Sequence, residues 1–181
     1  MLEIVVVVEP EKWNDERQEF ILPVTKKLQL EHSLVSLRKW ESKWQKPFLS
    51  KTAKTDEEAL DYVKCMTITQ HVDPDIYRLL SEENYRQINE YIEAPMTATT
   101  FSADKNGKSN REIITAELIY YWMIALNIPV KFEKWHLNSL LTLIRVCNIK
   151  NAPPKKTSKT ELMRHNAALN AARRQKYNSR G

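Results

Sequence analysis

Glycine is nearly missing from this sequence of 181 residues, in which it occurs only at Gly107 and Gly181. Tight hairpin turns need backbone positions with positive φ, and glycine adopts these at the lowest steric cost. A chain that has no glycine before residue 107 is therefore poorly suited to a fold built from many β-hairpins. The scarcity of glycine predicts a mainly helical protein.

Cysteine and long apolar runs are also scarce. The two cysteines, Cys65 and Cys147, are far apart in the sequence, which argues against a disulfide framework or a zinc site and favours a reducing compartment. The longest internal apolar run, residues 118–126, is much shorter than the roughly 20 residues that a membrane-spanning helix needs. The opening segment lacks the basic flank and cleavage site of a secretory signal. We therefore expect a cytoplasmic protein without a membrane segment.

Positive charge is concentrated at one end of the chain. From Lys155 onward there are eight Lys and Arg residues and one acid, Glu161, whereas the remaining residues carry 20 basic and 22 acidic groups. The net charge of +5 is therefore the sum of about +7 on this segment and about −2 on the rest. Because Pro153 and Pro154 break the chain just before it, we predict a helical body over residues 1–152 and a basic arm over 153–181.

β-Structure is predicted only in the first part of the chain. Residues 2–8 are rich in β-branched side chains and too few for a stable helix, so they are expected to form a strand. Residues 19–24 are the expected partner strand, with Pro23 at an end or edge because proline cannot donate a ladder hydrogen bond. A two-stranded ribbon is marginally stable alone. We therefore expect it to pack against helices.

Capping signals predict about six helices in the body and one in the arm. A capping side chain satisfies the free N–H groups of a first turn, and a Glu three residues later completes the pair. The expected starts are Ser33, Thr55 with Glu58, Asp73 before Pro74, Ser81, Ser109 with Glu112, Trp135, and Ser158 with Glu161. The predicted fold class is therefore α+β and predominantly helical, with an N-terminal β-ribbon on a helical bundle and a basic C-terminal helical arm.

Two apolar segments are expected to form the centre of this body. A helix over about 111–126 is apolar on nearly every face, which is typical of a core element or an oligomer contact. The helix that Trp135 opens carries a second apolar stripe. The side chains predicted to be buried together are Trp122, Leu126, Leu137, Leu141 and Ile144.

The polar residues show no arrangement typical of an enzyme. The four histidines have no metal-ligand spacing, and His136 is expected to cap a helix or to be partly buried. The Gly-Lys-Ser within 104–109 lacks the upstream glycine and strand of a phosphate-binding loop, so we expect a turn there. The acid pairs Glu57–Glu58 and Glu82–Glu83 lie in first helical turns, where carboxylates favour the helix dipole. We expect no catalysis, cofactor or metal.

Several long blocks of the sequence resemble a family of small proteins from the tail-morphogenesis regions of long-tailed bacteriophages, the tail assembly chaperones. The blocks are Ser36–Trp44, Lys46–Phe48, Tyr91–Thr99, Tyr121–Pro129, Trp135–Asn138 and Leu140–Arg145. The resemblance implies a non-catalytic protein that coats the tape measure protein, a long apolar helical polymer, and recruits tail tube subunits around it. It also implies a protein of the host cytoplasm that is absent from the mature virion.

Partner-binding residues are expected in both parts of the chain. The body has more aromatic surface than it easily buries, which favours homo-oligomerisation or client binding. The arm has strong helix propensity but few apolar groups, so it is expected to bind a partner. The predicted contact residues are Trp40, Trp44, Tyr120, Trp122, Leu162, Met163, Leu169, Arg173 and Arg174. Two alternatives are a nucleic-acid-associated phage protein that uses the basic arm and a structural tail or neck component of the virion.

Overall fold

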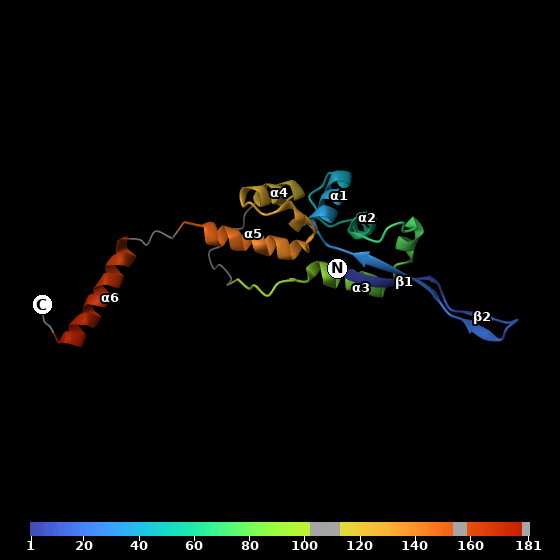
Figure 1. The fold of residues 1–181 in the computed structure, drawn as a ribbon, viewed down its shortest axis with the longest axis horizontal. Helices are drawn as coiled ribbons and strands as arrows, with labels where there is room; N and C mark the ends of the chain where they lie inside the picture. Colours follow the sequence, from blue (N-terminus) through green and yellow to red (C-terminus); the bar gives the residue numbers. More distant parts are fainter. Residues whose placement is uncertain (102–112, 154–158, 179–181) are drawn as a thin grey trace. The chain divides into compact units, whose positions relative to one another are not determined.

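A computed structural model describes residues 1–101, 113–153 and 159–178 of the chain. The chain divides into two compact units, Met1–Asn148 and Ile149–Gly181. The first contains the β-structure and most of the helices, and the second contains the basic arm (Figure 1). The α+β, helix-rich fold class is confirmed, because a two-stranded antiparallel ribbon packs against helices. The predicted boundary after residue 152 lies just beyond the last helix of the body.

The ribbon pairs β1 (Leu2–Glu9) with β4 (Val24–Leu30), in a register that places Leu2 opposite Leu30 and Val7 opposite Thr25. Side chains alternate between the two faces of a strand, so Ile4 and Val6 are buried against the helices while their neighbours are exposed. The expected partner strand over 19–24 is therefore wrong, and the true partner begins where that segment ends. The expectation failed because the first four residues of β4 are exposed, so apolar alternation marks only its end.

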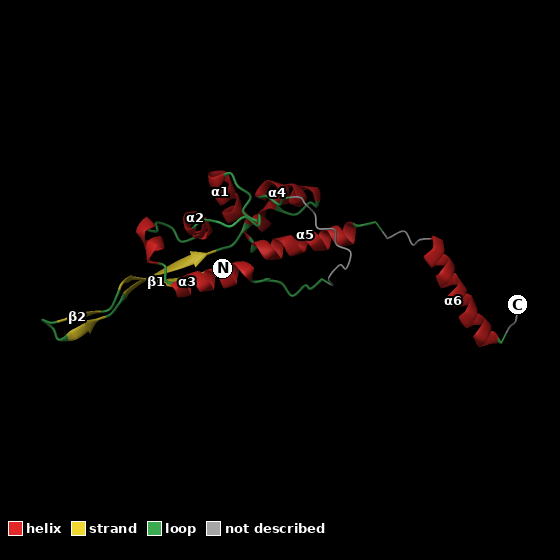
Figure 2. Cartoon of the chain, turned by 180° about the vertical axis from the view of Figure 1, so that it is seen from behind, coloured by secondary structure: helices red, strands yellow, loops and turns green. Residues whose placement is uncertain are grey.

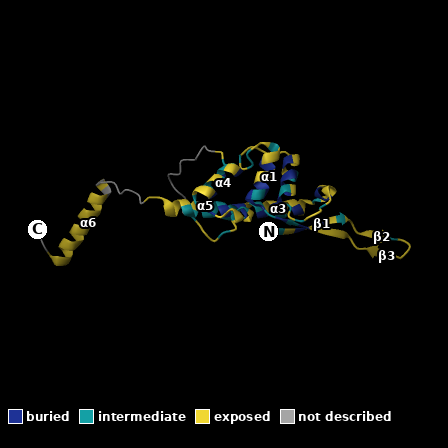
Figure 3. Cartoon of the chain, turned by 45° about the horizontal axis from the view of Figure 1, so that its top comes forward, coloured by how far each residue is buried: buried dark blue, intermediate teal, exposed yellow. Residues whose placement is uncertain are grey.

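The segment between the two expected strands, together with the first residues of the expected partner strand, forms a second, separate hairpin. It joins β2 (Lys12–Asn14) to β3 (Glu19–Ile21), with Trp13 opposite Phe20. The Asn14 side chain accepts hydrogen bonds from the first turn residues, at 3.0 Å from the Glu16 nitrogen. Gln18 takes the left-handed conformation at φ 51° that glycine would adopt more easily. The hairpin extends the ribbon away from the helices and is exposed along nearly all of its length (Figures 2 and 3).

The first helices begin at the predicted caps. α1 (Leu34–Trp44) is capped by Ser33, and α2 (Asp56–Met66) by Thr55 with Glu58. The 3-10 helix η1 (Pro74–Leu79) has Asp73 as its cap, and α3 (Glu82–Glu93) has Ser81. Each capping side chain accepts a hydrogen bond from a first-turn N–H, which confirms these four starts.

These helices cover the inner face of the ribbon. Asn84 of α3 fixes the ribbon directly, because its side-chain amide donates to the Val5 carbonyl at 3.1 Å. Trp40 joins α1 to α2 by donating to the Glu58 carbonyl at 2.8 Å. The resulting first core cluster consists of Ile4, Val6, Leu28, Leu30, Trp40, Tyr62, Val63, Met66, Ile76, Tyr77, Ile88 and Tyr91.

The second half of the body adds α4 (Ala116–Ala125), the 3-10 helix η2 (Val130–Lys134) and α5 (Leu137–Asn151). α4 is capped by Thr115, so the described helix begins later than the predicted start near residue 111. The predicted cap at Ser109 with Glu112 lies outside the described residues. α4 packs on α1, and together with α5 it forms a second core cluster of Leu34, Leu37, Ala116, Ile119, Met123, Ile128, Leu137, Leu140 and Ile144.

The predicted core was partly wrong in this region. Leu137 and Ile144 are buried as expected, but Trp122, Leu126 and Leu141 are only half-buried. The central positions belong instead to Ile119, Met123 and Leu140. The error has a simple cause: a helix that is apolar on every face carries no stripe to show which face points inward.

The arm contains α6 (Lys159–Tyr177). Its described side chains from Thr160 to Asn178 are all exposed. The predicted cap at Ser158 with Glu161 lies outside the described part of the arm. Alanine and arginine dominate α6, so its helix propensity is high while it has little to bury.

Candidate partner-binding surfaces

His136 has a structural role, as expected. Its Nδ1 accepts a hydrogen bond from the Asn138 backbone N–H at 3.3 Å, which caps the start of α5. Its Nε2 lies 3.0 Å from the Tyr91 carbonyl, so the ring also ties α5 to the end of α3. Burial lowers the pKa of His136, which favours the neutral form that accepts one hydrogen bond and donates the other.

His32 lies beside His136, with the two ring centroids 5.1 Å apart. Its Nδ1 shares a hydrogen bond with the Tyr62 hydroxyl at 2.6 Å. Burial, assisted by the neighbouring histidine, lowers the pKa of His32 to about 4. Among the described residues, the hydrogen-bond partners of the two imidazoles are a tyrosine hydroxyl and backbone groups. The pair connects structural elements and shows no catalytic geometry.

Glu58 and the two thiols also lie in structural environments. Glu58 accepts from the Thr55 N–H at 2.9 Å, and a side-chain hydrogen bond from Lys46 holds the pKa of Glu58 below its usual value. Both thiols are half-buried, and burial raises the pKa of Cys65. Among the described residues, no group of three or more His, Cys, Asp or Glu side chains is arranged to hold a metal ion. The Gly-Lys-Ser segment within 104–109 lies outside them.

Two of the predicted aromatic contact residues belong to the packing of α1 on α2. Trp40 is only 1% exposed, so it is a core residue and its prediction as a contact residue is corrected. Trp44 is half-buried, and its Nε1 donates to Asp61 Oδ2 at 2.9 Å. The mistake arose because a tryptophan stripe on a helix has the same spacing whether it faces a core or a partner.

The exposed apolar surface of α4 lies at positions close to, but different from, the predicted residues. Tyr120 is half-buried and donates to Glu133 Oε2 at 2.7 Å, and Trp122 is also half-buried. By contrast Tyr121 is 63% exposed and Ile124 is 73% exposed. These two side chains are three residues apart, so they lie on the same face of the helix. We call Tyr121 and Ile124 the α4 face.

The predicted contact residues of the arm are all accessible. Leu162, Met163 and Leu169 expose apolar side chains on α6, and Arg173 and Arg174 expose charge toward its end. Leu162 and Leu169 are seven residues apart and therefore lie on the same face of α6, and Met163 adjoins Leu162. The arm can therefore offer both apolar and cationic contacts to a partner.

The hairpin β2–β3 carries an aromatic pair that the sequence analysis did not select. Trp13 and Phe20 face each other across the strands with ring centroids 4.8 Å apart in an edge-to-face arrangement. They are 50% and 63% exposed. The signal in the sequence was two aromatic residues on either side of an Asn-Asp turn segment, and the expectation that residues 19–24 pair with the first strand concealed it.

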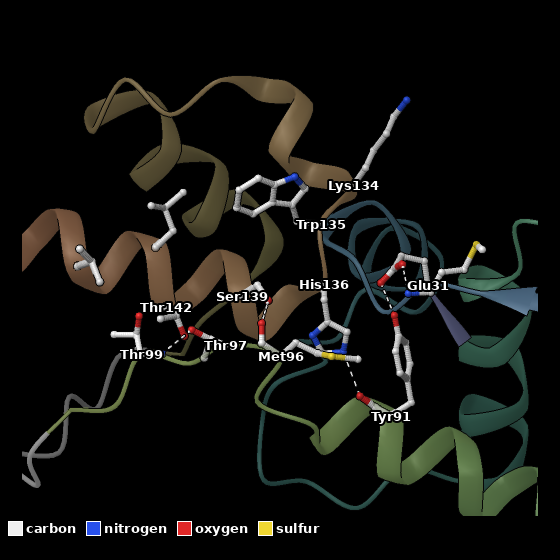
Figure 4. A pocket seen from close by; sticks show the side chains of 13 residues that line it. Glu31, Tyr91, Met96, Thr97, Thr99, Lys134, Trp135, His136, Ser139 and Thr142 are labelled. Carbon is white, nitrogen blue, oxygen red and sulfur yellow. Dashed lines mark hydrogen bonds and ion pairs between the residues drawn. The ribbon is translucent and has the colours of Figure 1, made fainter. Parts of the chain in front are cut away.

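A groove of about 720 Å³ lies between α5 and the segment that follows α3 (Figure 4). The side-chain amide of Asn138 donates to the Ala94 carbonyl at 2.8 Å and the Ser139 hydroxyl donates to the Met96 carbonyl, which holds this segment alongside α5. The apolar side chains that line the groove are Met1, Met96, Trp135, Leu143 and Val146. Its volume lies within the range of roughly 300–1,000 Å³ that is typical of binding pockets.

Comparisons of the chain with protein families, with curated proteins and with solved structures find no match. The described helices include none with the length and apolar character required to cross a bilayer. The interpretation as a tail assembly chaperone therefore stays a prediction, and the functional argument rests on the surfaces described above.

Proposed function

We propose that this chain is a non-enzymatic assembly chaperone that binds an apolar helical protein client. The client proposed from the sequence resemblance is the tape measure protein of a long-tailed bacteriophage, with tail tube subunits as the second partner. The protein would act in the host cytoplasm and be absent from the mature virion. The observation that supports the proposal best is the α4 face.

One face of α4 packs on the body, and another face carries exposed apolar side chains. Ala116, Ile119 and Met123 attach it to the second core cluster, whereas Tyr121 and Ile124 point into solvent. Exposed apolar side chains release free energy when a partner covers them, at about 25 cal/mol per Å² of apolar surface. Residues spaced three apart on a rigid helix match the ridges of a second amphipathic helix. A long helical client would supply many such ridges.

The arm supports binding of a second partner. Its described side chains are all exposed, so Leu162, Met163 and Leu169 remain available to a partner. The adjacent alanines leave a low surface that another helix can approach closely. Arg173 and Arg174 add positive charge for an acidic partner. A client site on α4 and a recruiting site on α6 would together bring a tail tube subunit to the tape measure protein.

The test is co-expression with the tape measure protein of the same phage, scored as the amount of soluble client. The native chain should keep the client soluble. The double variant Tyr121→Asp with Ile124→Asp should lower soluble client to the level found without the chaperone, because charge on the α4 face removes its apolar contact.

A matched control changes exposed apolar residues elsewhere on the body. Ile68→Asp with Leu79→Asp introduces the same charge at side chains of comparable exposure outside α4, and it should leave client solubility unchanged. Equal solubility with the α4 variant and the native chain would refute the α4 site. Failure of the native chain to solubilise the client would refute the chaperone function.

A further inference from the structure

We propose that the hairpin β2–β3 of one copy docks into the groove beside α5 of a second copy, so that the chain assembles head to tail. The inference goes beyond client binding, because it concerns a different surface and a different partner. It rests on a preformed aromatic tip, a preformed apolar groove and opposite charge on the two.

The hairpin tip carries a preformed aromatic pair that remains exposed among the described residues of the body. Trp13 and Phe20 already contact each other edge to face, so their side chains lose little further conformational entropy when a partner covers them. Aromatic side chains are the commonest anchors of protein interfaces because each buries a large apolar area. The Asn14 side chain fixes the turn through hydrogen bonds to the N–H groups of Glu16 and Arg17.

The groove is also preformed, and apolar side chains line part of it. Trp135 stacks on Phe132 with ring centroids 4.1 Å apart, which holds the indole at one wall of the groove. Met1, Met96, Leu143 and Val146 complete the apolar lining, and the polar lining includes the side chains of Thr97, Thr99 and Thr142. Its volume of about 720 Å³ is large enough for two aromatic side chains. Trp135 and Met96 both remain exposed, so an occupant would cover apolar surface.

Charge is opposite on the two surfaces. Residues 9–22, which include the hairpin, contain five acidic and two basic side chains, a net charge of −3. Lys134 lines the groove (Figure 4), and Arg145 lies next to Val146 with its guanidinium 4.0 Å from the Phe101 ring centroid. The one acid of the groove, Glu31, accepts a hydrogen bond from the Tyr91 hydroxyl at 2.6 Å. An acidic hairpin is therefore attracted to this groove, whereas two hairpins repel each other.

The positions of the two surfaces determine the kind of assembly. The hairpin lies at the end of the ribbon, away from α5, in both views of the fold (Figures 1 and 2). A hairpin therefore reaches the groove of another copy rather than its own. Contacts between two different patches are heterologous, and they propagate into rings or open chains rather than closing as a simple dimer.

Sedimentation velocity of the full chain over a concentration series tests the proposal. The native chain should form species larger than dimers as concentration rises. Trp13→Ala with Phe20→Ala should weaken association roughly tenfold or more, as loss of interface anchors does. Ile68→Ala with Leu79→Ala removes exposed apolar side chains elsewhere and should leave association unchanged.

Complementation makes the test specific to the pairing. The groove variant Lys134→Glu with Trp135→Ala keeps an intact hairpin, and the hairpin variant keeps an intact groove. Each variant alone should therefore be mostly monomeric at concentrations where the native chain associates, while an equimolar mixture at the same concentration should form heterodimers. Circular dichroism of each variant checks that the helical fold is retained. A native chain that stays monomeric would overturn the proposal, and so would a mixture that forms no heterodimer. Neither result bears on client binding, because no client is present.

Discussion

His32 and His136 join the two halves of the body. The Leu137 backbone N–H donates to the His32 carbonyl at 2.7 Å, and Ser33 pairs with His136 through an isolated antiparallel bridge. The two imidazoles thus stand where the end of the ribbon meets the start of α5. Protonation of either ring places a positive charge between the two core clusters. Among the described residues, the side chains that contact the His32 ring are those of His136 and Tyr62, and neither carries a negative charge.

Acid should therefore destabilise the fold in a defined pH window. The pKa of His32 is about 4 in the folded chain against its ordinary value of 6.5, so the unfolded chain binds the proton first as pH falls. The stabilising contribution is fully present above pH 6.5 and is lost as pH falls through about 4. The free energy of unfolding should decrease by on the order of 3 kcal/mol across this window. Urea unfolding at several pH values measures it.

The variant His32→Gln provides the control, since glutamine keeps a polar partner for Tyr62 but does not titrate. Its stability should vary less between pH 6.5 and 4 than that of the native chain. Part of the dependence should remain, because burial also lowers the pKa of His136. An unchanged slope in this variant would show that His32 does not carry the effect.

At the scale of elements, the sequence predicted helix starts better than helix faces. Capping is local: a Ser, Thr or Asp side chain needs only the N–H groups of the next turn, so Ser33, Thr55, Asp73 and Ser81 were identified from their neighbours alone. β4 pairs with β1 along its whole length, but only side chains near its end, Leu28 and Leu30, are buried against the helices. Those contacts are long-range, and the exposed start of β4 concealed them.

The candidate surfaces show the same limit. An apolar periodicity predicts that a side chain will be covered, but it does not distinguish a core from a partner. Trp40 therefore appeared in the predicted contact set although it is buried, and Tyr121 did not although it is exposed. The exposure of the arm was simpler to predict, because the arm has few apolar residues other than alanine and so has little to contribute to a core. Its predicted contact residues are accessible.

The helix α5 allows a direct test of which face is buried. Leu140 is fully buried in the second core cluster, whereas its neighbour Leu141 is half-buried. Leu140→Ala should lower the free energy of unfolding by about 2–5 kcal/mol, the usual range when a buried leucine is truncated. Leu141→Ala is the matched control and should cost clearly less, because a half-buried side chain leaves a smaller cavity. Chemical denaturation of both variants measures the difference, and equal losses would contradict the assigned face.

In the whole molecule, the excess of positive charge and the buried core clusters lie in different parts of the chain. The body is nearly neutral and holds both core clusters, whereas the basic groups are concentrated in the arm. A nearly neutral body limits repulsion between copies packed along a client. A basic arm can hold a partner by apolar contacts or by its charge. These two modes respond differently to salt.

Deletion of residues 153–181 should leave the melting temperature of the body nearly unchanged. The described side chains of α6 are all exposed, so the deletion removes no buried apolar group from either core cluster. Differential scanning calorimetry compares the two forms. A fall of more than about 4 °C, which in a body of this size corresponds to a loss of more than about 1 kcal/mol, would show that the arm stabilises the body.

The same deletion should abolish one binding function, and salt identifies which. Apolar binding through Leu162, Met163 and Leu169 should persist at salt concentrations that screen exposed charges, since the hydrophobic contribution does not depend on charge. Phosphate binding through Arg173 and Arg174 should instead weaken steeply with salt and be independent of nucleotide sequence. We expect the first behaviour in titrations with tail tube protein, and we expect Leu162→Asp with Leu169→Asp to abolish it. If that variant binds normally while Arg173→Glu with Arg174→Glu abolishes retention of DNA, the arm is a nucleic-acid-binding element and the recruiting role assigned to it is wrong.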